Sequence, residues 1–411
     1  MQTPPVGLLR LILFGFLIGS MTGSIAAAAG LVILLDLPGS GTDPDRIDYA
    51  KLPRLKGDHA VVSIATRNDR PEVDGRVDLR NFRFELHNYL AHFGGRFWCI
   101  WSDGPVVEDE PTQEIRYATS KDGLRWSDSK SVTGTPAAPY AFIARGLWIR
   151  NGELLALGAH YKGKGAFGVD KELELHACAW DEKKGEWSFK QKLYGNAINN
   201  FAPQRLASGD WILTRRDSRF NVSVLIGGVK SLDDWQSFPV VGIGEVKGFR
   251  PDEPIFWPLP DQTLYALYRD NGGSRRVFHS TSTDQGRTWG KPVMSNFPNS
   301  TSKLFSMKTS RGYRVLVLNA NPNIGRRELH LAVSKDDRIF TRLAWLDIPA
   351  PPENEAVNTV SLRKKFSAGI GTLQYPHVIE HDGFLYIAFS RLKLQTEVLR
   401  VPLDAIEALL K

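Results

Sequence analysis

The chain is poor in cysteine and lacks the sequence motifs typical of metal and redox centres. Its 411 residues include two cysteines, Cys99 and Cys178, and neither a C-x-x-C nor an H-E-x-x-H motif. Both cysteines lie in apolar, strand-like runs, where buried free thiols are the usual outcome. A disulfide between them stays open, because sequence spacing does not decide it. We therefore expect no metal and no cofactor.

Clusters of basic residues are also missing, although the chain is basic overall. The net charge is +7 and the pI is about 9.2, yet no lysine- or arginine-rich run of the kind that binds nucleic acid occurs. The excess charge fits either an ordinary solvated surface or a field that attracts acidic substrates. We expect no nucleic-acid partner.

Helical patterning is scarce. Beyond the N-terminal apolar run, a short tail around Ile406–Leu410 is the one stretch that reads as a helix, whereas apolar and polar residues alternate in many short runs. Examples of such runs are Thr263–Tyr268, Tyr313–Leu318 and Phe384–Phe389. Alternation with period two is typical of half-buried strands, so the sequence predicts an all-β fold.

One long apolar run lies at the N-terminus. Residues 11–35 carry no charge and are bounded by Arg10 and Asp36, and a helix of that length exceeds the ~30 Å hydrocarbon core of a bilayer. Because Arg10 precedes the run, the rest of the chain is expected on the periplasmic or extracellular side. The alternative is a signal peptide cleaved near the small residues at 24–29, which would give a secreted protein.

These features divide the chain into four parts. We expect a signal-anchor or transmembrane segment at residues 1–35 and a stalk, rich in Pro, Gly and Asp, at residues 36–57. A β-domain follows at residues 58–405, with a C-terminal tail at residues 406–411. We favour an anchor that stays in place over a cleaved signal, because Leu31–Leu35 continues the apolar run beyond the small residues.

A repeat of about 50 residues runs through the β-domain. Strand pairs surround turns at positions 94–95, 151–152, 208–209, 260–261, 311–312 and 382–383. A period near 50 with several strands per unit indicates propeller blades, and six such turns predict six blades. The last unit lacks a clear fourth strand, which Asp58–Ile64 is expected to supply, closing the ring and removing open edges.

The most specific motif is Ser282–Trp289, which reads S-x-D-x-G-x-T-W. Asp and Gly suit a tight turn, and the Trp covers it. A shorter version occurs at Ser120–Trp126, and weaker ones at Ser231–Trp235 and Ser334–Phe340. This motif resembles the Asp-box, or BNR repeat, of the sialidase-like six-bladed β-propellers. The resemblance implies a structural turn without a catalytic role, in a divergent member whose site lies on the face away from these turns.

That resemblance implies a set of substrate-binding and catalytic residues. Glu253 and Arg269 match a family glutamate and arginine on adjacent strands, just ahead of the complete Asp-box. Arg326, with Arg327 as its rival, matches a further arginine that holds the substrate carboxylate. The alternative for each is a structural ion pair or a solvated loop charge.

Tyr375 and Asp109 complete the implied machinery. Tyr375 matches the family nucleophile, although Pro376-His377 follows it where sialidases carry a small residue. A phenol needs a base to accept its proton, and Glu253 is the implied partner. Asp109 matches the acid/base on a loop whose other carboxylates are Asp103, Glu108 and Glu110.

One arginine of the family's clamp is missing. Sialidases carry it in an F-R-I-P run, but the corresponding stretch here places Leu86 in register, and Arg83 falls three residues early. Arg250 is a candidate substitute from another blade. The departure weakens the expectation of sialic-acid hydrolysis itself.

His87-Asn88 resembles a second group of propellers, among which are polysaccharide lyases that act on uronate glycans. A histidine at this place can move a proton near neutral pH, and Tyr375 would be its partner. A histidine satisfied within the central channel is the structural alternative.

The sequence therefore predicts an exo-acting, retaining glycoside hydrolase of acidic or polar glycans. The expected roles are Tyr375, Glu253 and Asp109 in catalysis, with Arg269, Arg326, Arg250 and His87 in substrate binding. Two alternatives stay open: a uronate lyase using His87 and Tyr375, and a propeller that binds glycans without catalysis. We expect a monomer whose partners are a glycan and, through residues 11–35, a membrane.

Overall fold

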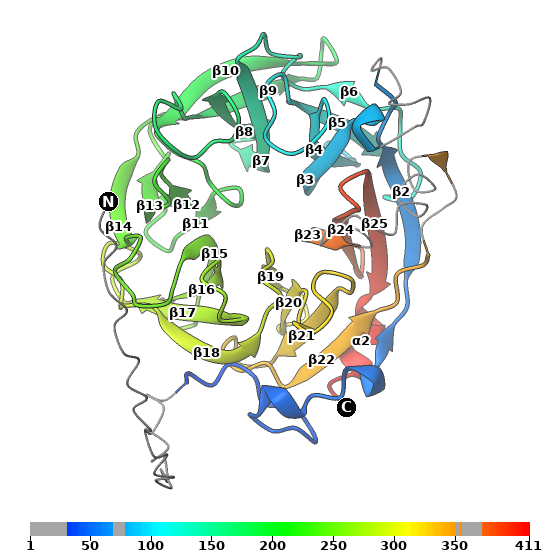
Figure 1. Ribbon diagram of the computed structural model, residues 1–411, viewed down its shortest axis with the longest axis vertical. Helices are drawn as coiled ribbons and strands as arrows, with labels where there is room; N and C mark the ends of the chain where they lie inside the picture. The colour runs from blue at the N-terminus through cyan, green and yellow to red at the C-terminus, as the bar shows by residue number, and fades with distance from the viewer. Residues whose placement is uncertain (1–30, 69–78, 351–353, 356–371) are drawn as a thin grey trace, which may run out of the picture. The chain divides into compact units, whose positions relative to one another are not determined.

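The computed structural model describes residues 31–68, 79–350, 354–355 and 372–411. In this part of the chain the strands form six sheets around a common centre, with β3, β7, β11, β15, β19 and β23 innermost (Figure 1). Within each sheet, successive strands pair antiparallel from the centre outward. The fold is the six-bladed β-propeller that the spacing of the turns predicts.

The first three blades follow one another along the chain. Blade 1 comprises β3 (Phe84–Phe93), β4 (Arg96–Gly104), β5 (Glu114–Ser120) and β6 (Lys130–Ser131). Blade 2 comprises β7 (Tyr140–Arg150), β8 (Glu153–Lys162), β9 (Glu174–Asp181) and β10 (Glu186–Gly195). Blade 3 comprises β11 (Gln204–Arg205), β12 (Trp211–Arg216), β13 (Val222–Gly227) and β14 (Gln236–Val241).

The last three blades complete the ring. Blade 4 comprises β15 (Pro251–Pro258), β16 (Leu264–Asp270), β17 (Arg276–Ser282) and β18 (Val293–Pro298). Blade 5 comprises β19 (Phe305–Lys308), β20 (Arg314–Leu318), β21 (His330–Ser334) and β22 (Arg342–Leu346), with β1 (Arg54–Leu55) at its edge. Blade 6 comprises β23 (Leu373–His381), β24 (Phe384–Arg391), β25 (Gln395–Pro402) and β2 (Asp58–Ile64).

Helical structure is confined to short pieces among the described residues. Three 3-10 turns, η1 (Pro44–Arg46), η2 (Tyr49–Lys51) and η3 (Leu79–Asn81), precede the first blade. Helix α2 (Leu403–Ala408) ends the chain and starts slightly earlier than the expected tail. It buries Leu403 and Ile406 against the last blades.

The ring closes through its two ends, as the sequence predicts. Strand β2, from the start of the domain, pairs antiparallel with β25 near its end, from Asp58 opposite Arg400 to Ile64 opposite Gln395. This pairing gives blade 6 its fourth strand. It also covers the hydrogen-bonding edge of β25, which would otherwise be open to another strand.

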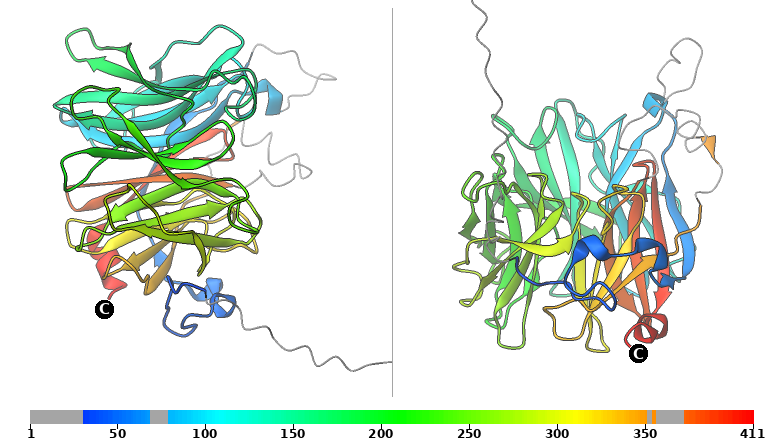
Figure 2. Two further views of the ribbon diagram at one scale, coloured as in Figure 1. Left: turned by 90° about the vertical axis from the view of Figure 1, so that its left-hand side faces the viewer. Right: turned by 60° about the horizontal axis from the view of Figure 1, so that its bottom comes forward.

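Residues 32–57, expected as the end of the anchor and a stalk, lie along the outside of blades 4 and 5 (Figure 2). Val32 bridges Ser295, and β1 pairs parallel with β22. The buried Asn296 side chain accepts the Leu34 and Leu35 backbone N–H groups at 2.8 and 3.0 Å. The apolar run thus ends against protein, because Leu34 and Leu35 are buried in the core.

The first thirty residues of the predicted anchor lie outside the described part of the chain. Within the described part, the structure contains no helix with the length and apolar character needed to cross a bilayer.

The Asp-box turns adopt the geometry that their sequence predicts. In the complete box, Asp284 accepts hydrogen bonds from the Ser282 hydroxyl and from the Thr288 N–H, both at 2.8 Å. The Trp289 indole donates to the Gly286 carbonyl at 2.9 Å. The weaker Ser231 and Ser334 motifs keep the serine-to-aspartate bond, so loss of the consensus has not abolished the turn.

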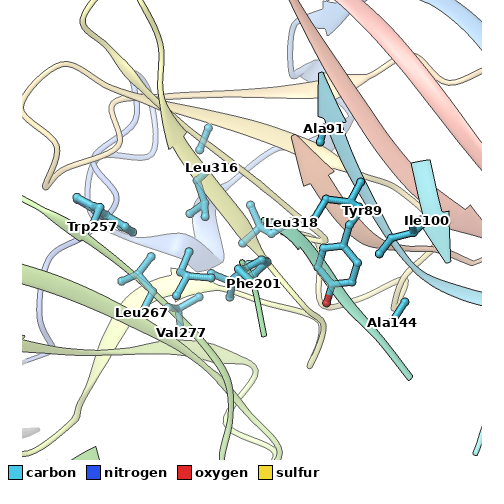
Figure 3. Close-up of a cluster of buried hydrophobic side chains, with 14 of the residues drawn as sticks. Tyr89, Ala91, Ile100, Ala144, Phe201, Trp257, Leu267, Val277, Leu316 and Leu318 are labelled. Atoms are coloured by element: carbon cyan, nitrogen blue, oxygen red, sulfur yellow. The ribbon is translucent and has the colours of Figure 1, made fainter. Parts of the chain in front are cut away.

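The core joins the blades around the centre. Its largest cluster takes Tyr89 from blade 1, Phe201 from the segment before β11 and Leu318 from blade 5, which gather together in Figure 3. Cys99 and Cys178 are buried and free, as expected, each within a separate blade.

Candidate active site

The innermost strands are irregular where they begin. Strands β3, β15 and β23 each shift register at a short bulge. At these bulges His87, Glu253 and Tyr375 have φ values of 58°, 40° and 58°. Side chains other than glycine rarely adopt positive φ, and such strain gathers at functional sites. The three predicted residues therefore share one backbone conformation, a positive φ at a bulge near the start of an innermost strand.

All of these bulges lie on the same face of the ring. First strands begin, second strands end and third strands begin on that face, whereas the Asp-box turns follow the ends of third strands on the other face. Arg216 at the end of β12 and Arg269 at the end of β16 consequently join Glu253 and Tyr375. The candidate site lies opposite the Asp-boxes, as predicted.

Glu253 and Arg269 form a buried ion pair across β15 and β16. The Arg269 Nη1 donates to Glu253 Oε2 at 2.7 Å, and the Glu253 residue is 2% exposed. Burial raises the pKa of Glu253, but the charges of Arg269, Lys303 and Arg216 outweigh burial and hold it at about 2. Glu253 is therefore an anion at neutral pH.

Tyr375 lies within this charged group. Its ring meets the His87 ring edge-on, with centroids 4.7 Å apart, and Asn88 Nδ2 donates to its backbone carbonyl at 3.0 Å. Burial and the Glu253 charge raise the pKa of the Tyr375 phenol, while Arg269 and Arg326 lower it. At rest the phenol keeps its proton, so reaction requires a base.

Arg326 reaches the group from the loop between β20 and β21. Its Nη1 donates to Gln374 Oε1 and its Nη2 to the Thr301 carbonyl, both at 2.7 Å. Both partners are neutral, so the guanidinium charge is not neutralised by them. Its charge acts on Tyr375 and Glu253, which places Arg326 beside the predicted catalytic pair, whereas its rival Arg327 is exposed.

The carboxylates of the loop between β4 and β5 differ in their partners. Asp103 pairs with Arg83, Glu108 with Lys393 at 2.6 Å, and Glu110 with Lys164 at 2.9 Å. Among the described residues, Asp109 has no such cation.

Asp109 also differs in its titration. Burial and the neighbouring Glu108 charge raise the pKa of Asp109 to about 6, against the opposing effect of Arg145. A carboxyl group that keeps its proton close to neutral pH is suited to general acid catalysis.

His87 is fully enclosed. Its Nδ1 lies 3.1 Å from the Ser102 hydroxyl and its Nε2 lies 3.2 Å from Glu108 Oε1. Burial lowers the pKa of His87 to about 4, although Glu108 opposes this effect. Both ring nitrogens are thus occupied by protein groups, and the imidazole is neutral.

Neither of the two positions near the missing clamp arginine places a cation in the site. Leu86, at the position where sialidases carry that arginine, is buried and packs with Phe84 against Tyr375. Arg83 is bound to Asp103 and lies 3.6 Å from Glu114. Neither position supplies a cation to the site.

Arg250, the proposed substitute, also lies apart from the buried cluster. Its side chain is exposed just before β15. Its backbone N–H donates to Asp270 at 2.9 Å, which fixes the start of β15 without bringing the guanidinium to Tyr375.

Two buried arginines that the sequence analysis missed belong to the site. Arg145 lies on β7 and Arg216 at the end of β12, and they are 2% and 3% exposed. Arg216 is paired with Asp252. A sequence signal exists for Arg216, since Arg216-Asp217 of blade 3 recurs as Arg269-Asp270 one blade later. Arg145 lies in the middle of a largely apolar strand whose other charge is the terminal Arg150.

A buried lysine lies beneath these groups. Lys303 Nζ donates to the Tyr89 hydroxyl at 2.7 Å and lies 5.4 Å from the centre of the Tyr375 ring. Burial lowers its pKa well below the ordinary lysine value. With two buried arginines, Arg145 and Arg216, and two half-buried ones, Arg269 and Arg326, the site carries an excess of cationic groups, which suits an anionic ligand.

Comparison with solved structures finds the same fold at low identity. A protein of unknown function from Dyadobacter fermentans is 12% identical with a TM-score of 0.60, covering 84% of this chain and 99% of its own. Trypanosoma rangeli sialidase in complex with sialic acid is 14% identical with a TM-score of 0.59, covering 87% of this chain.

This chain spans 60% of the length of the Trypanosoma rangeli protein. The NanB sialidase of Streptococcus pneumoniae is 12% identical with a TM-score of 0.59, covering 78% of this chain and 69% of its own. Identities in this range show the fold alone. No curated protein matches the sequence.

A family model gives a closer assignment. The model described as BNR repeat-like domain matches residues 88–387, which include every blade in whole or in part and all of the Asp-box turns. The chain therefore belongs to the BNR repeat-like domain family, as a divergent member with the sialidase-like six-bladed propeller fold.

Proposed function

We propose that the protein is a retaining glycoside hydrolase that acts on an acidic glycan. The observation that carries this proposal is the meeting of Tyr375, Glu253 and Arg269, from β23, β15 and β16, on the face opposite the Asp-boxes. A buried phenol beside an anionic carboxylate and a cation is an arrangement for an activated nucleophile. The known activity of the sialidases with this fold agrees with it.

In the first step, Tyr375 attacks the anomeric carbon. Its phenolic proton passes to Glu253, while Asp109 gives its proton to the glycosidic oxygen and the bond to the leaving group breaks. A glycosyl-tyrosine intermediate remains. Asp109 is suited to this acid role because its raised pKa keeps it protonated.

In the second step, water replaces the tyrosine. The Asp109 carboxylate accepts a proton from a water molecule, whose oxygen bonds to the anomeric carbon as the sugar–tyrosine bond breaks. The proton on Glu253 returns to Tyr375. The net change is the addition of one water molecule across the glycosidic bond, with retained configuration after two displacements.

The substrate carboxylate would trigger proton transfer. Arg269 holds the pKa of Glu253 low in the empty site, and so opposes its use as a base. A carboxylate bound by Arg269 and Arg326 would neutralise part of that positive field. The pKa of Glu253 would then rise toward the value that proton transfer from Tyr375 requires.

We also propose that the propeller is exported and acts as a monomer. The uncharged residues that follow Arg10 support export through a membrane anchor or a cleaved signal. Because Val32–Leu35 pack against blades 4 and 5, any membrane-spanning segment ends before Val32.

A substrate panel tests the proposed activity. Chromogenic glycosides of sialic acid and glucuronic acid, together with uronate polysaccharides, are offered to the wild type and to Tyr375→Phe. We expect release of the aglycone from an acidic glycoside by the wild type and a loss of at least ~100-fold in kcat/KM in Tyr375→Phe, since the nucleophile is removed.

The matched control is Tyr313→Phe, which removes a buried hydroxyl bound to the Leu403 carbonyl on the other face. We expect it to keep wild-type activity. Equal activity of Tyr375→Phe and the wild type would contradict the assignment of the nucleophile. Binding of acidic glycans without any turnover would favour a glycan-binding propeller instead.

A second candidate function is a uronate lyase. The observation that favours it is the edge-on contact between His87 and Tyr375, the two residues that such a lyase would use. In that reaction a base removes the proton next to the uronate carboxylate, and the leaving group departs as an unsaturated sugar forms. The panel separates the two, because the unsaturated product absorbs in the near ultraviolet. The occupied nitrogens of His87 argue for the hydrolase.

A further inference from the structure

Arg145 is a buried cation without a carboxylate partner. Its residue is 2% exposed, and its Nε and Nη1 have no hydrogen-bond partner among the described residues. Its charge acts on the neutral Tyr89 hydroxyl. A buried charge that lacks a counter-ion is costly, so the position calls for an anion that the described residues do not supply.

Two other arginines of the site differ from Arg145 in this respect, whereas the buried Lys303 also has only neutral partners, the Tyr89 hydroxyl and the Asn200 carbonyl. Arg216 is paired with Asp252, and Arg269 with Glu253. The two pairs leave Arg145 as a cation available to a ligand within the described part of the chain. Asp109, on which Arg145 acts, has a raised pKa and does not neutralise it below about pH 6.

The backbone around Arg145 is built to hold it in place. Strand β7 shifts register between Ala144 and Gly146. A side chain at Gly146 would come within 2.8 Å of the Ala202 backbone nitrogen, and its φ of 131° suits glycine. Asn199 Nδ2 donates to the Arg145 carbonyl at 2.9 Å. The bulge, the close approach at Gly146 and the Asn199 hydrogen bond fix the backbone at Arg145. A backbone fixed in this way indicates a preorganised binding group.

Arg145 lies across the ring from the proposed carboxylate clamp. Arg269 and Arg326 come from blades 4 and 5, whereas Arg145 comes from blade 2, which faces blade 5 in a ring of six (Figure 1). Its charge acts on Asp109 and on Tyr161, whose buried hydroxyl also lacks a partner among the described residues. Arg145 therefore lies beside the proposed acid, where the leaving group would sit, and its charge also acts on Glu253.

We propose that Arg145 and the Tyr161 hydroxyl form a second anion subsite, which binds an acidic group on the leaving-group sugar. This inference rests on the proposed function. It assigns a substrate with acidic groups on both sides of the scissile bond, such as a carboxylated or sulfated oligosaccharide. Arg269 and Arg326 bind the acid of the attacked sugar, and Arg145 binds that of its neighbour.

Paired aglycones test the inference. The acidic glycosides of the panel are prepared with a 4-nitrophenyl and with a 3-carboxy-4-nitrophenyl aglycone, and kcat/KM is measured for the wild type and Arg145→Gln. Because hydrogen bonds to a charged group are strong, we expect Arg145→Gln to lose about 10- to 100-fold on the carboxylated aglycone and less than about threefold on the neutral one.

Two variants serve as controls. Arg219→Gln removes an exposed positive charge from the loop after Arg216 on the same face, and it should leave the preference between aglycones unchanged. Arg145→Lys should restore part of that preference. An equal loss on both aglycones in Arg145→Gln, or no preference in the wild type, would overturn the inference while leaving the hydrolase proposal intact.

Binding separates the two proposals if no glycoside is cleaved. Dissociation constants for the same ligands are measured by calorimetry with the wild type and with Arg145→Gln. Selective loss of affinity for the carboxylated ligands would support the subsite although the hydrolase proposal had failed. Equal affinities of the two proteins for every ligand would overturn the subsite.

Discussion

Asp109 is set apart from the neighbouring carboxylates by a difference in partners. Glu108 forms ion pairs with Lys393 and His87, and Glu110 forms one with Lys164. Asp109 is instead largely buried and lies close to the Glu108 charge. A proton on Asp109 relieves that repulsion. One loop thus contains carboxylates with opposite protonation states, the arrangement that acid catalysis requires.

We predict that the rate falls as the pH rises through about 6. Because the pKa of Asp109 is raised to about 6, the acid form is present below that pH and is lost above it. The pH profile of kcat/KM should therefore have a descending limb near pH 6.

The variant Asp109→Asn should lose ~100-fold or more in rate toward substrates with poor leaving groups and should lack the descending limb. Glu110→Gln should keep it, because Glu110 is already paired with Lys164. A limb that survives in Asp109→Asn would assign the acid to another group.

The residues of the site were predictable to different degrees. Glu253, Arg269, Arg326 and Tyr375 follow from their place relative to the Asp-box, since blade phase fixes which strand ends meet. Arg145 was not predictable in this way, because its strand reads as apolar core. Arg250 stays an untested candidate for the replacement cation, and its sequence proximity to Glu253 does not reveal that its side chain is exposed.

At the level of single elements, the turns were easier to predict than the bulges. Ser, Asp and Gly specify the Asp-box directly through local hydrogen bonds. The bulges in β7, β15 and β23 instead accept hydrogen bonds from outside their own blades. The donors are Asn199 to the Arg145 carbonyl, Asn200 to the Pro254 carbonyl and Asn88 to the Tyr375 carbonyl. Glu253 and Tyr375 each precede a proline and still adopt positive φ, which local preference alone disfavours.

The Asp-box at Ser120 also joins two blades, and this can be tested. At Gly123, which has a φ of 74°, an added Cβ would overlap the Tyr386 ring of blade 6. We predict that Gly123→Ala destabilises the fold by about 2–4 kcal/mol through backbone strain and overpacking. Chemical denaturation measures the effect.

Gly134→Ala is the matched control, because Gly134 has a φ of 68° and open space around it. It reports backbone strain alone, of about 1 kcal/mol. Equal losses in the two variants would show that the contact with Tyr386 contributes nothing.

For the whole molecule, ring closure is the main structural device. The first and last strands of the domain share blade 6 through the pairing of β2 with β25. Closure holds six blades in one ring and so keeps Arg145 and Arg326 on opposite sides of one site.

Two truncations test the importance of closure. Deletion of residues 1–57 removes the segment along blades 4 and 5 but keeps β2, and we expect a folded monomer of lower Tm. Deletion of residues 1–64 also removes β2 and exposes the β25 edge, so we expect aggregation. Size-exclusion chromatography and thermal unfolding distinguish these outcomes. A stable monomer without β2 would contradict the role of closure.

The overall fold was the most predictable feature, because the repeat, the strand alternation and the Asp-boxes agree with one another. The segment before β2 was not. An apolar run reads alike whether it faces lipid or protein, so Leu34 and Leu35 were assigned to the anchor although they pack into the core. Pro, Gly and Asp after them suggested a stalk, but residues 36–57 carry β1 and two 3-10 turns on the propeller surface.

The central claim, that Tyr375 is the nucleophile of a retaining hydrolase, is tested most directly by trapping the intermediate. A fluorinated analogue of the best acidic glycoside slows the second step, and mass spectrometry of the digested protein locates the bound sugar. We predict a single adduct on the peptide that contains Tyr375, absent in Tyr375→Phe. Turnover without an adduct, or an adduct on another residue, would contradict the account.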